Sequence, residues 1–207
     1  MLKNKIKVLD IQPNSFAQYQ LINRANRYNL EFAKYPGSHL VVQNGMLSGV
    51  WMLGNAYKGS GYYGAYPPAY LKRLAALFPD CKKIMHLFSG SLPPGDYIRV
   101  DTTRAGIVQP DVVTDAENLG EFKSFDLIYA DPPYSIADAV HYGTKMVNRK
   151  KVLEECSRVL KPGGFVVWLD TVWPMIAKKH LVLVGVIGIL RSQNHRVRFV
   201  FIMQKPI

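Results

Sequence analysis

The segment FDLIYADPPY, residues 125–134, decides the fold prediction for this chain. Its first six residues form a short apolar run rich in β-forming residues, which predicts a buried strand. Pro132 and Pro133 end that strand, because neither can donate a hydrogen bond to a neighbouring strand and each restricts the residue before it. An acid, Asp131, and an aromatic ring, Tyr134, therefore stand at the carboxyl end of a strand, where open α/β sheets place their ligands.

On both sides of this segment the pattern alternates between strands and helices. We expect strands at residues 82–88, 97–101, 111–114 and 165–169 and helices at residues 69–78, 148–160 and, in a short form, 174–179. Residues 181–190 and 195–203 predict an antiparallel hairpin at the edge of the sheet. The alternation predicts an α/β fold with a doubly wound, mostly parallel, seven-stranded sheet that helices cover on both faces.

The first 57 residues are expected to form a small N-terminal lobe or extension. A helix is predicted from Ser15 to Arg27, and short strands at residues 41–42 and 50–53 flank a turn at Gly45. Residues 58–207 would then form the main domain.

The residue types of the tetrapeptide suit chemistry on an exocyclic amine, which is a poor nucleophile because its lone pair is delocalised into the ring. The carboxylate of Asp131 and the backbone carbonyl of Pro132 can accept the two amine hydrogens, which aims the nitrogen lone pair at an electrophile. The ring of Tyr134 offers a base a stacking face, worth about 1–3 kcal/mol per base in single-strand binding proteins. The alternative is that Asp-Pro-Pro-Tyr is only a strand-ending turn.

The tetrapeptide Asp131, Pro132, Pro133 and Tyr134 resembles the catalytic signature of amino-group methyltransferases, which transfer a methyl group from S-adenosylmethionine (SAM) to a nucleic-acid base. The resemblance covers roughly residues 58–205 and implies the Rossmann-like fold of class I methyltransferases. In these families a glycine loop wraps the methionine part of SAM. Here Phe88, Gly90 and Ser91 match that loop, whereas His86 stands where an acid is common and Leu92 stands where a glycine is expected.

The resemblance also implies the rest of the SAM site. It assigns cofactor binding to Tyr66, Pro67, Phe88, Ser89, Gly90, Ser91, Asp101, Thr102, Asp115 and Ala116. Asp101 would bind the ribose hydroxyls, and Asp115 would lie near the adenine amine. An isolated acid after a strand is also a common cap or turn residue, so a structural role for each stays open.

Two departures from the family pattern stand out. Only residues 89–96 separate two expected strands, and Pro93, Pro94 and Gly95 lie among them, so the helix that normally follows the glycine loop should be reduced or absent. The chain also leaves no room for a target-recognition domain, which makes a partner subunit for target recognition possible. Residues 135–151 could form a loop beside the base pocket, with cations that contact phosphate.

Composition points to a polyanionic partner. The net charge is +11, and the residues after Tyr134 contain 12 Lys and Arg against 4 Asp and Glu, a surplus of +8. Nucleic acid is the commonest partner of such a chain, although a solvated basic surface is the alternative. The two cysteines lie far apart and fit no disulfide framework or metal site. A cytoplasmic protein is expected, without a membrane span, because the longest apolar run has only ten residues.

Three functions remain open on the sequence. The leading one is a SAM-dependent DNA methyltransferase acting on N6 of adenine, with N4 of cytosine less favoured and DNA favoured over RNA. The second is an RNA methyltransferase acting on N2 of guanine. The third is a degenerate, non-catalytic subunit with a methyltransferase fold. The small size, by analogy, suggests a phage or mobile-element enzyme.

Overall fold

The computed structural model describes residues 16–53, 66–102, 108–191 and 194–207. The strands in these ranges are β1 (Val41–Gln43), β2 (Met46–Leu53), β3 (Ile84–Leu87), β4 (Ile98–Asp101), β5 (Val112–Val113), β6 (Phe125–Ala130), β7 (Leu160–Asp170), β8 (Val182–Arg191) and β9 (Asn194–Gln204). The helices are α1 (Phe16–Glu31), α2 (Tyr70–Leu77), α3 (Ile136–His141) and α4 (Arg149–Val159), with a 3-10 turn, η1 (Pro36–Ser38). None of these helices is both long and apolar enough to cross a bilayer.

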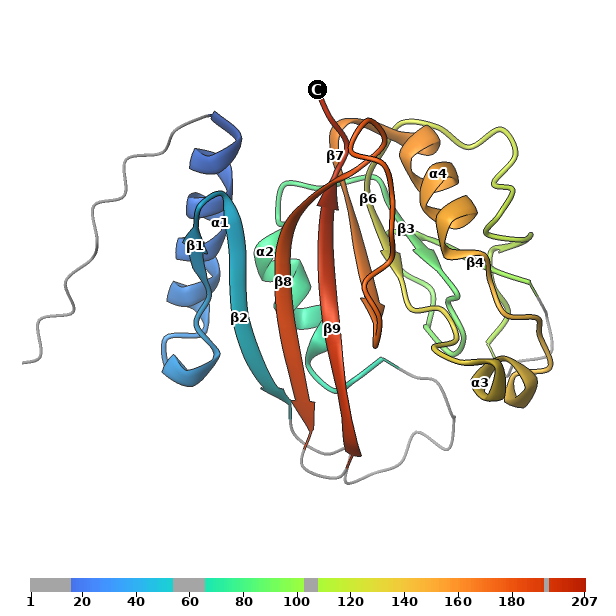
Figure 1. The fold of residues 1–207 in the computed structure, drawn as a ribbon, viewed down its shortest axis with the longest axis horizontal. Helices are drawn as coiled ribbons and strands as arrows, with labels where there is room; N and C mark the ends of the chain where they lie inside the picture. Colours follow the sequence, from blue (N-terminus) through green and yellow to red (C-terminus); the bar gives the residue numbers. More distant parts are fainter. Residues whose placement is uncertain (1–15, 54–65, 103–107, 192–193) are drawn as a thin grey trace, which may run out of the picture.

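All the strands belong to one sheet, in the order β1-β2-β8-β9-β7-β6-β3-β4-β5 (Figure 1). β5, β4, β3, β6 and β7 pair in parallel, and β9 runs antiparallel to both of its neighbours, β7 and β8. This order confirms the α/β class and the mostly parallel sheet with a C-terminal antiparallel hairpin.

Two expectations about the sheet are wrong. Within the described residues it has nine strands rather than seven, and the hairpin β8–β9 lies inside the sheet rather than at its edge. β2 pairs in parallel with β8, in register from Leu47 with Gly185 to Leu53 with Arg191. The side chains of Leu47, Trp51 and Leu53 are buried in the same core as β8. The strand assigned to a separate lobe therefore gains both a hydrogen-bonding partner and a core by joining the sheet.

The predicted division into residues 1–57 and 58–207 falls within residues 54–65, which lie outside the described part of the chain. It stays a prediction. What the structure adds is that β1 and β2 continue the sheet of the main domain.

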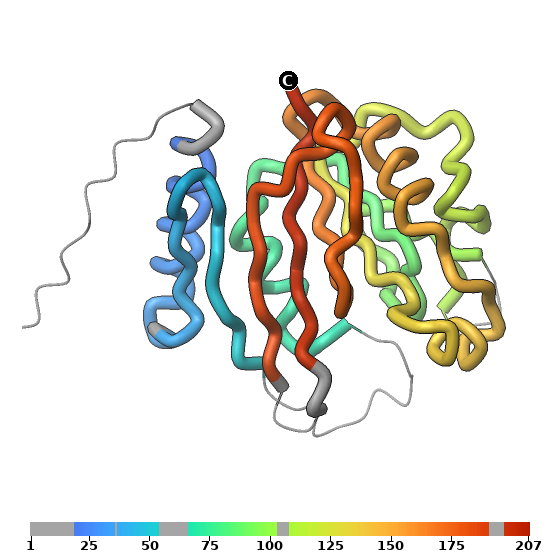
Figure 2. Tube along the Cα trace, viewed as in Figure 1, coloured from blue at the N-terminus to red at the C-terminus, as the bar shows by residue number. Residues whose placement is uncertain are grey.

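Helices cover both faces of the sheet. Alternate residues of a strand point to opposite faces, and β6 shows both: Leu127 and Tyr129 join a core that includes α1 and α2, whereas Ile128 and Ala130 join a core that includes α4. The tube trace follows the same arrangement, with α1 near the β1–β2 side and α4 near β6 and β7 (Figure 2).

Short segments differ most from the sequence prediction. No helix forms near residues 174–179, whereas α3 forms within residues 135–151, where a loop was expected. A helix of six residues gains little from propagation, so its cap matters: Ser135 accepts a hydrogen bond from the backbone N–H of Asp138. Between β3 and β4 there is no helix, as the prolines and glycine of that connection predicted.

Candidate active site at the carboxyl edge of the sheet

The carboxyl ends of four parallel strands lie level with one another. Leu87 of β3 pairs with Val100 of β4 and with Ala130 of β6, and Ala130 pairs with Trp168 of β7. The chain therefore leaves each of these strands at the same edge of the sheet. The predicted site residues found at this edge are Phe88, Ser89, Gly90, Ser91, Asp101, Thr102, Asp131, Pro132, Pro133 and Tyr134.

Asp131 and Tyr134 contact each other directly. The Tyr134 hydroxyl donates a hydrogen bond to Oδ1 of Asp131 over 2.5 Å. Pro132 and Pro133 between them are buried, and the Tyr134 ring packs against the core that includes α1 and α2. The tyrosine hydroxyl thus takes one of the acceptor sites of the Asp131 carboxylate.

The charge state of Asp131 changes near neutral pH. Burial raises the pKa of its carboxyl to about 7, the hydrogen bond from Tyr134 and the charge of Arg198 oppose the rise, and the negative charge of Asp170 adds to it. Burial also raises the pKa of Tyr134 well above 10, so its hydroxyl stays a donor. Strongly perturbed acids in such positions are candidates for functional groups.

Behind this pair lies a buried ion pair that sequence reasoning missed. Arg149 donates to the carboxylate of Asp170 over 2.7 Å and to the backbone carbonyl of Tyr134 over 3.0 Å. Asp170, at the end of β7, is fully buried and also accepts a hydrogen bond from the Trp168 indole. The sequence signal for Asp170 was only that an acid follows the apolar strand expected at residues 165–169. Arg149 was included among the cations of residues 135–151 that were expected to contact phosphate.

Asp101, the acid expected to bind the ribose hydroxyls, forms a hydrogen bond with the glycine loop. Oδ2 of Asp101 accepts a hydrogen bond from the Gly90 N–H over 2.9 Å, and Oδ1 accepts one from the Thr102 N–H over 2.8 Å. Phe88 and Gly90 have φ of 58° and 49°, so the chain turns sharply, and the Ser89 side chain is buried. The structure thus brings the predicted loop and acid together, and the carboxylate keeps lone pairs for further donors.

Tyr66 and His86 lie beside this loop. The Tyr66 hydroxyl lies 3.3 Å from Nδ1 of His86, and Asp131 and Asp101 both contribute to a raised Tyr66 pKa, after the larger effect of burial. His86, surrounded by tyrosine rings, is buried, which lowers its pKa to about 3. The imidazole is therefore neutral where the family pattern has an acid. Pro67, next to Tyr66, is buried.

Asp115 and Ala116 lie on the turn after β5, next to β4, where Val113 pairs with Asp101 and the Thr114 N–H donates to the Asp101 carbonyl. Asp115 accepts a hydrogen bond from the Glu117 N–H over 2.9 Å and forms an ion pair with Lys145 over 3.0 Å. These donors lower the pKa of Asp115, and Ala116 is buried in the core that includes α4. Among the described residues no hydrogen bond or ion pair joins Asp115 to Asp101 or Asp131.

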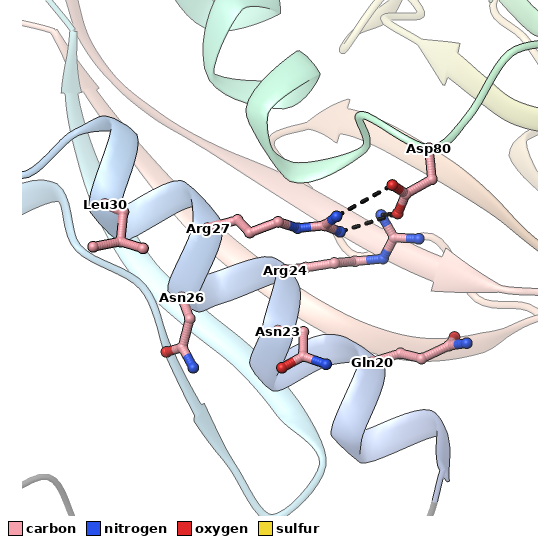
Figure 3. Close-up of a pocket in the computed structure, with 7 residues that line it drawn as sticks. All are labelled: Gln20, Asn23, Arg24, Asn26, Arg27, Leu30 and Asp80. Carbon is pink, nitrogen blue, oxygen red and sulfur yellow. Dashed lines mark hydrogen bonds and ion pairs between the residues drawn. The ribbon is translucent and has the colours of Figure 1, made fainter.

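A groove of about 450 Å³ lies elsewhere, along α1 (Figure 3). Its lining residues are Gln20, Asn23, Arg24, Asn26, Arg27, Leu30 and Asp80. Arg27 donates two hydrogen bonds to Asp80, over 3.1 and 3.0 Å, and Asp80 precedes β3 and so lies toward the amino ends of the strands. Because its charges pair with each other and it lies away from the carboxyl edge, this groove is not the candidate site.

No protein-family model matches this sequence, and no curated protein matches it. Solved structures with a similar fold include TrmN from Thermus thermophilus, with 17% identity over 68% of this chain and a TM-score of 0.48. This chain spans 49% of the length of that protein. The putative methyltransferase yhhF from Escherichia coli has 11% identity over 66% of this chain and 83% of its own, with a TM-score of 0.45.

The N-methyltransferase NodS from Bradyrhizobium japonicum has 13% identity and a TM-score of 0.42. The match covers 61% of this chain and 87% of the NodS chain. Because all three identities are below 25% and all three TM-scores below 0.5, we base the function on the residues of this chain. Its own strand order establishes the α/β fold with a mostly parallel sheet and an antiparallel C-terminal hairpin.

Proposed function

We propose that this protein transfers a methyl group from SAM to an exocyclic amino nitrogen of a nucleic-acid base, with N6 of adenine in DNA as the preferred target. One observation carries the proposal: a half-buried acid, Asp131, stands at the carboxyl edge within Asp-Pro-Pro-Tyr, bonded to Tyr134, and has a pKa raised to about 7. Ligands of open α/β sheets bind at this edge.

Asp131 and the Pro132 carbonyl would accept the two hydrogens of the target amine, and Tyr134 would stack on the base. As the nitrogen bonds to the methyl group it must lose a proton, and a carboxylate that titrates near pH 7 suits that step. The rest of the catalysis is positioning. A base in duplex DNA would have to leave the stack to reach Asp131.

The residues at the edge fit SAM, which supplies an electrophilic methyl group on a positively charged sulfur. The carboxylates of Asp101 and Asp131 make the edge favourable for a cation. Asp101, already fixed by Gly90 and Thr102, can accept ribose hydroxyls. In this proposal the remaining cofactor contacts come from Tyr66, Pro67, Phe88, Ser89, Ser91, Asp115 and Ala116.

The net charge of +11 supports a nucleic-acid partner. In this proposal a partner subunit supplies target recognition, and the small chain belongs to a phage or mobile-element enzyme. RNA methylation at N2 of guanine and a non-catalytic role are the competing outcomes of the test.

The test incubates the purified protein with isotopically labelled SAM and, separately, with duplex DNA, single-stranded DNA and total RNA. Mass spectrometry of the digested pools identifies the labelled nucleoside. Labelled N6-methyladenine from DNA is expected, and label only in RNA guanine would replace the proposed target.

A D131A variant serves as the matched control. We expect it to lose transfer while its SAM affinity, measured by calorimetry, stays nearly unchanged. Retained turnover in D131A would overturn the role of Asp131, and absence of SAM binding by the unmodified protein would favour a non-catalytic subunit.

A further inference from the structure

Arg198 interrupts an apolar row on β9. Residues 198, 200 and 202 share one face of the strand, and Val200 and Ile202 are buried in the core that includes α1 and α2. Arg198 lies toward the carboxyl edge of the sheet, opposite Ile189 of β8. A cation in such a row needs a polar partner, and the candidate site provides it.

That partner is Tyr134. The Arg198 guanidinium lies 5.4 Å from the centre of the tyrosine ring, and its Nη1 donates a long hydrogen bond, 3.4 Å, to the tyrosine hydroxyl. Arginine has five N–H donors in a planar fork. Arg198 forms no salt bridge with any of the described residues. Most of its N–H donors are therefore not used by that part of the chain.

The contacts form a chain from Arg198 through Tyr134 to Asp131. The tyrosine hydroxyl accepts from Arg198 and donates to Oδ1 of Asp131. The hydroxyl takes one acceptor site of Oδ1, so its departure would free that site for a target amine. Arg198 contacts both the ring and the hydroxyl of Tyr134, so a new partner for Arg198 would change the contacts of the tyrosine as well.

We propose that Arg198 binds a phosphate of the nucleic acid beside the target base, and that this exchange of partners releases Tyr134 from Asp131. The inference rests on the proposed function and extends it to a residue outside the tetrapeptide. A guanidinium fork fits a phosphate with two parallel hydrogen bonds. These are stronger than the single long bond to Tyr134, so the exchange favours the open arrangement only when nucleic acid is present.

The experiment measures how the affinity for a DNA oligonucleotide depends on salt, by fluorescence anisotropy. R198M removes the charge and keeps the apolar stem, R198K restores a charge, and K34M removes an exposed cation on the turn after α1. Each phosphate contact contributes about 0.7–0.9 to the slope of log affinity against log salt concentration. The slope for R198M should be smaller by about that amount, whereas R198K and K34M should keep the slope of the unmodified protein.

A second readout needs neither nucleic acid nor turnover. Carboxyl-carbon NMR of Asp131, assigned with D131N, should show a higher pKa in R198M, because the charge of Arg198 opposes the rise. Circular dichroism confirms that R198M is folded.

An R198M slope equal to that of K34M would overturn the inference even if methyl transfer is found. A reduced slope without methyl transfer would support the phosphate contact and overturn the proposed function instead. If the unmodified protein does not bind the oligonucleotide, the phosphate contact is overturned.

Discussion

Nε of Arg149 lies 2.7 Å from Oδ2 of Asp170, a carboxylate that is fully buried. The pair joins the first residue of α4 to the last residue of β7, and through the Tyr134 carbonyl Arg149 also contacts the Asp-Pro-Pro-Tyr segment. The guanidinium of Arg149 therefore links α4 to β7 and also fixes the backbone at Tyr134.

Replacing Arg149 with Met should destabilise the protein strongly. Removing one partner of a buried pair leaves an uncompensated charge, which costs about 3 kcal/mol or more. Urea denaturation would measure the loss. The matched control is K150M, which removes an exposed cation from a loose pair with Glu154 at 3.9 Å, and it should change stability by less than about 0.5 kcal/mol. Equal denaturation midpoints for the two variants would refute the prediction.

The raised pKa of Asp131 predicts a pH dependence of stability. Between its ordinary pKa of 3.8 and its folded pKa of about 7, the folded protein holds a proton that the unfolded chain releases. The unmodified protein therefore loses stability as pH rises through this window, whereas residue 131 of D131N does not titrate. We expect the free energy of unfolding of D131N, relative to the unmodified protein, to grow between about pH 4 and pH 7. A constant difference would show that Asp131 titrates normally.

Removing the Tyr134 hydroxyl should shift the pH profile of methyl transfer. The hydrogen bond from Tyr134 lowers the Asp131 pKa, so in Y134F the acid limb of the profile should move to higher pH while SAM affinity is unchanged. Initial rates between pH 5 and 9 provide the measurement. Y35F, which removes the hydroxyl of an exposed tyrosine, should match the unmodified protein. An unmoved limb in Y134F would exclude this coupling.

Asp101 should matter for SAM binding through the glycine loop. In D101N one of the two acceptor oxygens becomes an amide NH₂ and faces a backbone N–H, so one backbone donor loses its bond to a charged acceptor, which is worth about 1.5–3 kcal/mol. Calorimetry should show SAM affinity reduced roughly 10- to 100-fold. The control is D96N, an exposed position on the same connection. Unchanged affinity in D101N would remove Asp101 from the cofactor site.

The sequence predicted well where the strands at the carboxyl edge end. Asp131 and Asp101 were expected at strand ends because apolar runs, prolines and glycines mark those ends within a few residues. The register of β3, β4 and β6 then brings them to one edge. The partners of the tetrapeptide were not predictable in this way. Arg149, Asp170 and Arg198 are 15, 36 and 64 residues from Tyr134, and no local pattern shows that their strands and helix meet there.

The two errors about the sheet have the same cause. Nothing near β2 indicates that its partner is β8, so the sequence suggested a separate lobe and a hairpin at the sheet edge. The missing helix at 174–179 is a local matter, because that segment lacks a cap of the kind that Ser135 gives α3.

The pairing of β2 with β8 also bears on how the chain reaches its native state. Residues 47 and 185 are partners, so β2 emerges from the ribosome long before the strand that covers it exists. Contacts of this range slow folding, and an unpaired strand with a buried-type residue such as Trp51 is open to aggregation meanwhile. Production at low temperature or with a chaperone should therefore raise the yield of soluble protein.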